Sequence, residues 1–276
     1  MSPMRPLTCC IDLNGRVGVV TGGYGVLGGS MADGLAAAGV KVAILGRNPE
    51  AAEAKATALR AEGATATALA ADVLDDGQLR EARQRLLSAW GRIDLLINAA
   101  GGHVSEARTD NAPAFTMPLP AFDEVVRLNL HGTVHPTLVF GEAMAQQKKG
   151  SVVNISSMAA TQALRGVLGY SVAKAAVENF TRWMAVDLAR RCGEGLRVNA
   201  IAPGFFVAKQ NRGVLVRPDG SLTERARTIL ARTPMGRFGD PKELQGPVLW
   251  LCSDAASFVT GAVIPVDGGF SADSGI

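Results

Sequence analysis

The sequence contains no run of about 18 consecutive apolar residues, so it offers no candidate for a membrane-spanning helix. Its first residues, M-S-P-M-R-P-L-T-C-C-I-D-L, also lack an apolar stretch long enough for a signal peptide. Cysteine is scarce: the four present are Cys9, Cys10, Cys192 and Cys252, and none of them belongs to a C-x-x-C pair. This spacing indicates neither a disulfide framework nor a zinc site, and it favours a reducing compartment. We therefore expect a cytoplasmic protein with no membrane partner and no metal.

A strong excess of charge of one sign is missing as well. The 28 Lys and Arg residues outnumber the 25 Asp and Glu residues by only three, and the basic residues are scattered along the chain. Such a surface does not indicate nucleic-acid binding. The sequence also has no internal repeat, low-complexity segment or Pro/Ser-rich linker. Because 47% of the 276 residues are hydrophobic, the chain can bury a sizeable core, and we expect a single domain over residues 1–276.

Strand-like and helix-like stretches alternate along the chain at intervals of roughly 20–35 residues, which predicts repeated βαβ units. The expected fold is therefore α/β, with a doubly wound parallel sheet and helices on both faces. The strands, some with their exit turns, are expected at residues 17–21, 41–48, 64–73, 94–102, 150–157, 197–204 and 262–269. Residues 103–120 and 205–238 depart from this rhythm. Long insertions at the carboxyl ends of parallel strands often form substrate sites, although variable surface loops are an alternative here.

The first strand leads into a glycine-rich segment, T-G-G-Y-G-V-L-G-G-S, and then into a helix. Glycines permit a tight turn and a close approach of the backbone to a pyrophosphate, and the helix N-terminus supplies N–H donors. A glycine turn that only packs helix against strand is the alternative. The segment predicts a dinucleotide site that includes Gly22, Gly23, Tyr24, Val26, Leu27 and Gly28.

The end of the second strand bears on cofactor choice. Proteins that prefer NAD usually place a carboxylate there to bind the ribose 2′-hydroxyl, but this sequence has Gly46, Arg47 and Asn48. Since a guanidinium pairs well with a 2′-phosphate, NADP(H) is favoured and NAD(H) is the alternative. Asp72 and Val73, at the end of the third strand, are expected to cover the adenine.

Tyr170 and Lys174 lie four residues apart at the start of a predicted helix, so both side chains should lie on one helix face. A phenol is a weak acid, but a nearby lysine cation favours the phenolate and lowers the phenol pKa. Ser157 ends the preceding strand, where its hydroxyl could hold a carbonyl oxygen near the phenol. In isolation, the pair could equally be a helix-start aromatic residue with a solvated neighbour.

Together, these segments resemble the short-chain dehydrogenase/reductase family over almost the whole chain. The matching motifs are T-G-x-x-x-x-x-G from Thr21, D-V at Asp72, N-A-A-G from Asn98, R-L-N-L-H-G around Asn129, I-S-S ending at Ser157, Y-x-x-x-K from Tyr170, N-x-x-x-P-G from Asn199 and the terminal V-D-G-G.

The resemblance implies a seven-stranded Rossmann fold of strand order 3-2-1-4-5-6-7 in a dimer or tetramer. It also implies that Tyr170 is the general acid, that Ser157 holds the substrate oxygen, and that Lys174 lowers the tyrosine pKa and binds the nicotinamide ribose. Asn129 would hold a water that links Lys174 to solvent. Further cofactor contacts would come from Asn98, Ala99, Ala100, Gly101, Pro203, Gly204 and Phe206.

The sequence departs from the family pattern at three cofactor positions. Val26 and Ala99 replace a common glycine and asparagine, and Ala208 replaces a threonine that often binds the nicotinamide amide. None of these positions belongs to the group Asn129, Ser157, Tyr170 and Lys174. The resemblance therefore predicts an active enzyme and leaves the seating of the cofactor open.

Within the family, G-F-F-x-x-x-Q-N-R and T-P-M-G-R-F-G-x-P resemble a bacterial group of D-mannonate oxidoreductases, or fructuronate reductases. A sugar-acid substrate needs a cation for its carboxylate and polar groups for its hydroxyls. The candidates, besides Ser157, are His103, Arg165, Gln210, Asn211 and Arg212. One alternative is a reductase of 3-oxoacyl thioesters or general ketones, which an apolar pocket would support. Another is a gluconate 5-dehydrogenase-like enzyme. A non-catalytic redox sensor is disfavoured because all four family catalytic residues are present.

Overall fold

A computed structural model describes residues 11–109, 113–207 and 211–274 of the chain. Its centre is a seven-stranded sheet with the order β3-β2-β1-β4-β5-β6-β7, in which every neighbouring pair is parallel. The strands are β1 (Val17–Thr21), β2 (Lys41–Gly46), β3 (Ala66–Ala70), β4 (Leu95–Asn98), β5 (Gly150–Ile155), β6 (Leu196–Pro203) and β7 (Val263–Val266). This arrangement confirms the predicted fold class and strand order.

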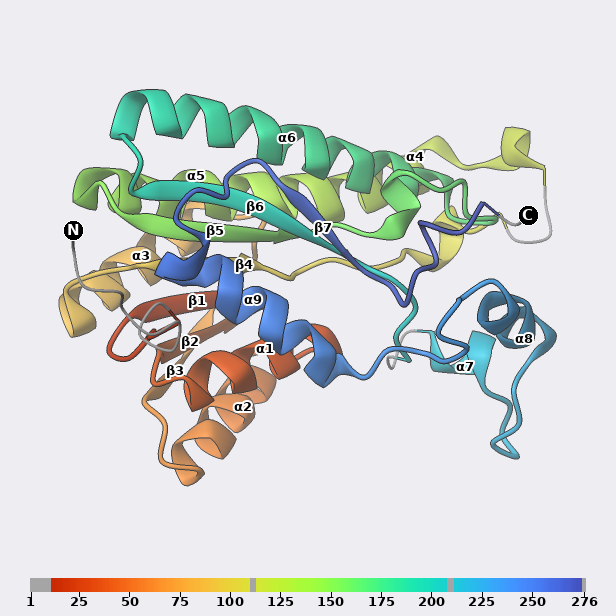
Figure 1. Ribbon diagram of the computed structural model, residues 1–276, viewed down its shortest axis with the longest axis horizontal. Helices are drawn as coiled ribbons and strands as arrows, with labels where there is room; N and C mark the ends of the chain where they lie inside the picture. The colour runs from red at the N-terminus through yellow and green to blue at the C-terminus, as the bar shows by residue number, and fades with distance from the viewer. Residues whose placement is uncertain (1–10, 110–112, 208–210, 275–276) are drawn as a thin grey trace, which may run out of the picture.

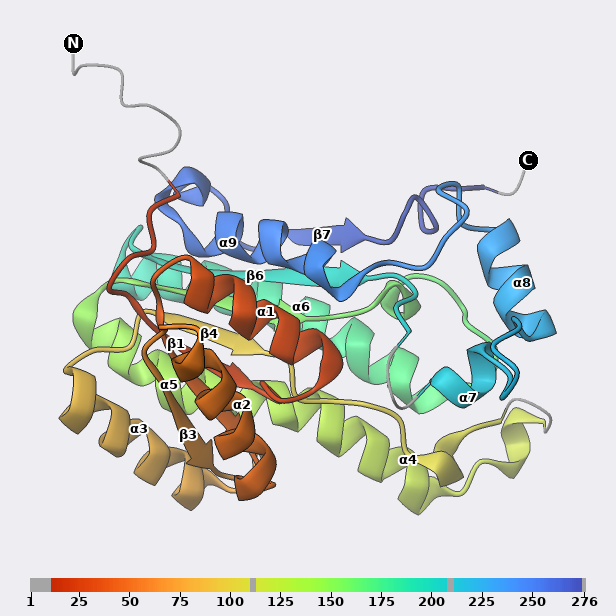
Figure 2. The same ribbon diagram turned by 90° about the horizontal axis from the view of Figure 1, so that it is seen from below.

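Two helical layers cover the sheet (Figures 1 and 2). One face packs against α1 (Val26–Ala37), α2 (Pro49–Ala61) and α9 (Gln245–Cys252), and the other against α3 (Asp76–Trp90), α5 (Gly132–Gln147) and α6 (Leu168–Cys192). Successive residues of a strand point to opposite faces, so Leu95 belongs to the first core and Leu96 to the second. Because both faces are covered, the central strands β1 and β4 are buried throughout and show no alternation of buried and exposed residues.

The helix starts follow local capping chemistry. The side chain of Asn48 accepts a hydrogen bond from the Ala51 N–H, and Pro49 occupies the first turn of α2. Asp75 caps α3 in the same way. Helix α1 differs, because its N-cap is Gly25, with no side-chain cap and no acidic residue in the first turn. The N–H groups at the start of α1 therefore have no partner from a capping side chain.

Helix α4 (Leu119–Val126) continues through a π-helical turn (Arg127–His131) into α5. The π turn widens the helix at Asn129, and such turns are frequent at functional sites. The predicted loop 103–120 contains short 3-10 turns at Ser105–Ala107 and Ala114–Thr116. Its last two residues belong to the first turn of α4.

The predicted insertion 205–238 contains two short helices, α7 (Arg212–Leu215) and α8 (Glu224–Ala231), which pack on each other through Leu215, Ala226 and Ile229. Figure 1 shows this small lobe beyond the carboxyl ends of the strands. Further 3-10 turns occur at Met158–Ala160, Pro241–Leu244 and Asp254–Ala256. Within the described ranges, no helix is both long and apolar enough to cross a membrane. The same residues bring together no group of His, Cys, Asp or Glu that could hold a metal.

Candidate active site

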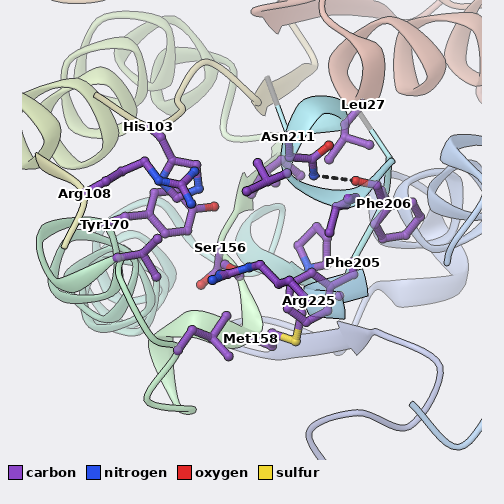
Figure 3. A pocket seen from close by; sticks show the side chains of 18 residues that line it. Leu27, His103, Arg108, Ser156, Met158, Tyr170, Phe205, Phe206, Asn211 and Arg225 are labelled. Carbon is purple, nitrogen blue, oxygen red and sulfur yellow. Dashed lines mark hydrogen bonds between the residues drawn. The ribbon is translucent and has the colours of Figure 1, made fainter. Parts of the chain in front are cut away.

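A pocket of about 160 Å³ lies at the carboxyl end of the sheet, between the core and the two insertions (Figure 3). The ends of β5 and β6 supply Ser157 and Pro203, and α6 supplies Tyr170. The described residues that line it are Leu27, His103, Arg108, Ile155, Ser156, Ser157, Met158, Leu164, Val167, Tyr170, Pro203, Gly204, Phe205, Phe206, Asn211, Val214, Leu215 and Arg225. Residues predicted for the cofactor and for the substrate thus meet in one cavity.

Tyr170 lies in the first turn of α6 and reaches the pocket with its phenol. It packs against the small apolar cluster of Ala107, Ala121 and Val125, and its ring centre lies 4.4 Å from that of His103. Burial raises the pKa of Tyr170 above its usual value, while a side-chain hydrogen bond with Ser157 opposes the shift. The phenol therefore keeps its proton through the neutral range and is suited to act as an acid.

Lys174 lies one turn further along α6 and is buried. Its Nζ donates a 2.7 Å hydrogen bond to the carbonyl oxygen of Ile155 and lies 5.4 Å from the ring centre of Tyr170. Burial lowers the pKa of Lys174 to about 8. At Tyr170 desolvation has the largest influence on the pKa, and Lys174 donates its hydrogen bond to the Ile155 carbonyl. That the lysine cation lowers the tyrosine pKa stays a prediction.

Asn129, in the π turn, holds the backbone beside Tyr170 and Lys174. Its Nδ2 donates to the carbonyl oxygens of Gly102 and Val125, both at 2.8 Å, and its Oδ1 accepts from the Gly102 N–H at 3.0 Å. The side chain therefore fixes the turn that follows β4. Gly101, in that turn, has Lys174 Nζ as a neighbour: an added Cβ would lie 3.5 Å from this nitrogen.

Two buried polar residues beneath the pocket were not predicted from the sequence. The hydroxyl of Ser156 donates to Glu178 Oε1 at 3.0 Å, and Glu178 also accepts from Arg182 at 3.2 Å. Glu178 is buried and lies four residues after Lys174, on the same face of α6. In the sequence, the four-residue spacing from Lys174 was the signal that could have pointed to Glu178.

The turns that follow β1 and β4 lie side by side and have features expected of a dinucleotide site. Thr21 Oγ1 accepts from the N–H groups of Ala99 and Ala100, both at 3.1 Å, and so joins the two strand ends at the point where the strand order reverses. Gly22 has φ +63°, and a Cβ there would lie 3.0 Å from the Ala100 backbone, so this turn requires glycine. The uncapped N-terminus of α1 adds donors for a pyrophosphate.

Other residues predicted for the cofactor lie at the same edge of the sheet. The ring of Tyr24 lies over Gly46, and its hydroxyl accepts from the Asn48 N–H at 3.3 Å. Arg47 is exposed beside them. Asp72 Oδ1 accepts from the Leu74 N–H at 2.9 Å. Asn98 is turned into the interior, where its Nδ2 donates to Thr137 and Asn154, so its side chain supports the strand ends.

Of the predicted substrate residues that the structure describes, some line the pocket and others are exposed outside it. His103 and Asn211 line the pocket, and Asn211 Nδ2 donates to the Phe206 carbonyl at 2.8 Å. Arg165 and Arg212 are exposed and are not among the lining residues. Gln210 lies outside the described residues. The two arginines that do line the pocket, Arg108 and Arg225, were not predicted, and their positions in the irregular insertions gave no periodic signal.

Comparison with known proteins places the chain among oxidoreductases. Residues 25–271 match a family model described as enoyl-(acyl carrier protein) reductase. The chain belongs to the short-chain dehydrogenase/reductase family and is an enzyme of that family.

Three relatives show how close the similarity is. The chain is 45% identical to the uncharacterized oxidoreductase UxuB of Bacillus subtilis, over 96% of this chain and 98% of the relative. A crystal structure of a candidate D-mannonate oxidoreductase from Haemophilus influenzae, with bound NAD, has a TM-score of 0.90 at 39% identity and covers 96% of this chain and 98% of its own. A gluconate 5-dehydrogenase from Burkholderia cenocepacia, in complex with NADP and tartrate, has a TM-score of 0.86 at 32% identity with the same coverage.

Proposed function

We propose that the protein is an NAD(P)-dependent oxidoreductase that interconverts the ketone of a hexuronate and the secondary alcohol of a hexonate, of the D-fructuronate/D-mannonate type. The observation that carries the proposal is the hydrogen-bonded pair of Ser157 and Tyr170 in a pocket that also contains two arginines. The names of the relatives from Haemophilus influenzae and Burkholderia cenocepacia, both sugar-acid enzymes, support the substrate class.

The bound nicotinamide cofactor supplies a hydride to the carbonyl carbon. Ser157 holds the carbonyl oxygen within reach of the phenol, and Tyr170 donates its proton to that oxygen as the alcohol forms. The buried ammonium of Lys174 then stabilises the phenolate that is left. Asn129 keeps the Gly101–Gly102 turn in place beside them. In the reverse direction, Tyr170 accepts the proton of the alcohol.

NADP(H) is the proposed cofactor, with NAD(H) as the alternative. Arg47 is exposed at the end of β2 and no carboxylate stands at positions 46–48, which favours a 2′-phosphate. Tyr24 and Asn48 complete this part of the proposed cofactor site through their hydrogen bond. The relatives do not decide the matter, because one binds NAD and another NADP.

A second candidate substrate is a 3-oxoacyl thioester or another neutral ketone. The pocket is lined by apolar as well as polar residues, including Phe205, Val214 and Leu215, and an apolar lining is what such a substrate would require.

The family resemblance is also our basis for proposing a cytoplasmic dimer or tetramer. Exposed apolar side chains on α5 and α6, among them Leu138, Trp183 and Val186, support a covered helical face. Light scattering of the purified chain would test the assembly, and a monomer at micromolar concentration would contradict it.

The activity is tested with initial rates of ketone reduction by NADPH and NADH. The substrates are D-fructuronate, 5-keto-D-gluconate and an acetoacetyl thioester, each at matched concentration. We expect D-fructuronate to be reduced fastest, and faster with NADPH than with NADH. A preference for the thioester would overturn the substrate class and leave the reaction type standing.

A further inference from the structure

A buried carboxylate lies beneath the active-site pocket, and the proposed proton transfer does not use it. Glu178 belongs to α6, four residues after Lys174 and eight after Tyr170. We propose that Glu178 is a positioning residue: through Ser156, it holds the next residue, Ser157, against the catalytic phenol. The inference rests on the proposed function, because it assigns the residue that keeps the proton donor and its serine partner together.

Three side chains lie one turn apart on the same face of α6, and each bonds one of three consecutive residues that end β5 or follow it. The pairs are Tyr170 with Ser157, Lys174 with the carbonyl oxygen of Ile155, and Glu178 with Ser156. The first two pairs belong to the proposed proton transfer. Ser156 is joined to both of the other residues by peptide bonds, so the third pair fixes the residue between them.

Ser156, which borders the pocket in Figure 3, is held from two directions. Its N–H donates to the Ile201 carbonyl at 2.8 Å, which extends the pairing of β5 with β6. Its hydroxyl lies 3.0 Å from Glu178 Oε1 and 3.4 Å from the Lys174 carbonyl oxygen. Because a hydroxyl has one hydrogen, the shorter contact with the carboxylate is the stronger one. The sheet thus fixes the backbone of Ser156, and Glu178 fixes its distance from α6.

A carboxylate is a costly residue at this place in the fold. Glu178 is only 4% exposed, and burial of an ionised carboxylate is unfavourable unless it is well bonded. Besides Ser156, it accepts from Arg182 Nη2 at 3.2 Å, and the arginine side chain is 55% exposed. An apolar side chain of similar volume would pack there without this cost. Buried polar contacts of this kind fix one arrangement of the packed elements, and here the elements are α6 and the end of β5.

The next polar contact along α6 offers a matched comparison. Thr181 lies three residues after Glu178, and its hydroxyl accepts from Asn154 Nδ2 at 2.9 Å and donates to the Val177 carbonyl at 2.8 Å. Thr181 and Asn154 are fully buried, and their contact also joins α6 to β5, but it lies three residues away from Ser157. If such contacts only hold the fold together, loss of the Thr181 hydroxyl should affect catalysis as much as loss of the Glu178 carboxylate.

The test measures kcat, KM and NADPH binding for Glu178→Ala, Ser156→Ala and Glu178→Gln, with Thr181→Val as the control. The substrate is the ketone that the wild type reduces fastest. Glu178→Ala and Ser156→Ala should lower kcat about 10- to 100-fold, because a displaced Ser157 no longer aligns the ketone with the phenol. KM and the dissociation constant of NADPH should stay within a few-fold of the wild type.

The conservative variant and the control separate positioning from stability. Glu178→Gln keeps an oxygen acceptor for the Ser156 hydroxyl, so it should retain most of the wild-type turnover. Thr181→Val should lower the melting temperature and leave kcat near the wild-type value. Wild-type kcat in Glu178→Ala, no recovery in Glu178→Gln, or an equal loss in Thr181→Val would each overturn the positioning role. If Glu178→Ala does not fold, wild-type kcat in Ser156→Ala overturns it.

A spectroscopic readout separates this inference from the proposed function. The chain has two tyrosines, so in the Tyr24→Phe protein labelled with fluorotyrosine, fluorine NMR follows the titration of Tyr170 alone. Burial raises the pKa of Tyr170, and the hydrogen bond with Ser157 opposes that shift. The other titratable groups that contact the phenol ring, His103 and Lys174, are present in every variant.

In this background, Glu178→Ala should raise the pKa of Tyr170 as far as Ser157→Ala does, whereas Thr181→Val should leave it unchanged. An unchanged titration in Glu178→Ala would overturn the positioning role. If no ketone is reduced by the wild type, the proposed function fails, and this titration still decides the role of Glu178.

Discussion

The inner and outer sides of the active-site pocket are built in different ways. The inner side, formed by Asn129, Ser157, Tyr170 and Lys174, belongs to the sheet ends and to helices of the main core. Asn129 and Lys174 are buried and bound to backbone groups at 2.7–3.0 Å. The outer side, formed by Arg108, Asn211 and Arg225, comes from two insertions.

Each insertion has only a small apolar cluster of its own. Ala107, Ala121 and Val125 support Arg108, whereas Leu215, Ala226 and Ile229 support Arg225. Catalytic and binding groups both need fixed geometry, and the inner side obtains it from the main core. We therefore expect proton transfer to depend on the inner side, and the outer side, which stands on smaller apolar clusters, to be disturbed more easily.

The largest expected effect comes from removing the proton donor on the inner side. Tyr170→Phe should lower turnover of every ketone at least about 10²–10⁴-fold, because general acid catalysis is lost for all substrates alike. NADPH binding, measured by fluorescence titration, should stay within a few-fold of the wild type. Arg227→Gln, at an exposed arginine of α8, serves as the control and should leave turnover of every ketone near the wild-type rate. Turnover of any ketone at the wild-type rate by Tyr170→Phe would contradict the mechanism.

The next effect is a pH dependence that originates on the inner side. Burial lowers the pKa of Lys174 to about 8, so its positive charge is present below that pH and is lost above it. Burial raises the pKa of Tyr170, so the phenol stays protonated in the same range. We therefore expect kcat/KM for ketone reduction to be level near neutrality and to fall by up to about tenfold per pH unit above about 8.

Alcohol oxidation should rise over the same range: Tyr170 is mostly protonated there, but the small fraction present as phenolate, which acts as the base, grows as the pH approaches the tyrosine pKa. Steady-state rates in both directions at constant ionic strength would measure the two profiles. The Lys174→Met variant should reduce ketones at a much lower overall rate. Its rate of reduction should not decline at alkaline pH. A reduction rate that stays level well into the alkaline range would count against this role of Lys174.

The smallest expected effect concerns the packing that supports the outer side. Ile229→Ala loosens the lobe around α8, and because the lobe can open locally, we expect KM for the acid to rise a few-fold with little change in the unfolding free energy. Ile97→Ala, a fully buried residue of β4, should instead lower the unfolding free energy by about 2–5 kcal/mol. Urea unfolding and steady-state kinetics would check both variants. Equal destabilisation would show that lobe and sheet unfold as one unit.

Much of the inner side was predictable because its signals are local. The spacing of Tyr170 and Lys174 fixes their common helix face, and Gly22 marks the turn after β1 through a conformation that favours glycine. The role of Asn98 was harder to predict, since its amide turns inward to Thr137 and Asn154, and only the packed strands show this. The proposed roles of the remaining cofactor residues stay predictions.

The sequence by itself predicted the alternating elements and a parallel sheet, because side-chain periodicity acts over a few neighbouring residues. The order of the strands came instead from the motifs that resemble the family, since local periodicity does not say which strands are neighbours. Only the tertiary structure decided which cations border the pocket. Arg165 and Arg212 were predicted from the sequence and Arg108 and Arg225 were not, but in the folded protein the first pair is exposed and the second pair lines the cavity. Irregular segments pack against whatever surface the sheet and helices leave, and that surface exists only once the chain has folded.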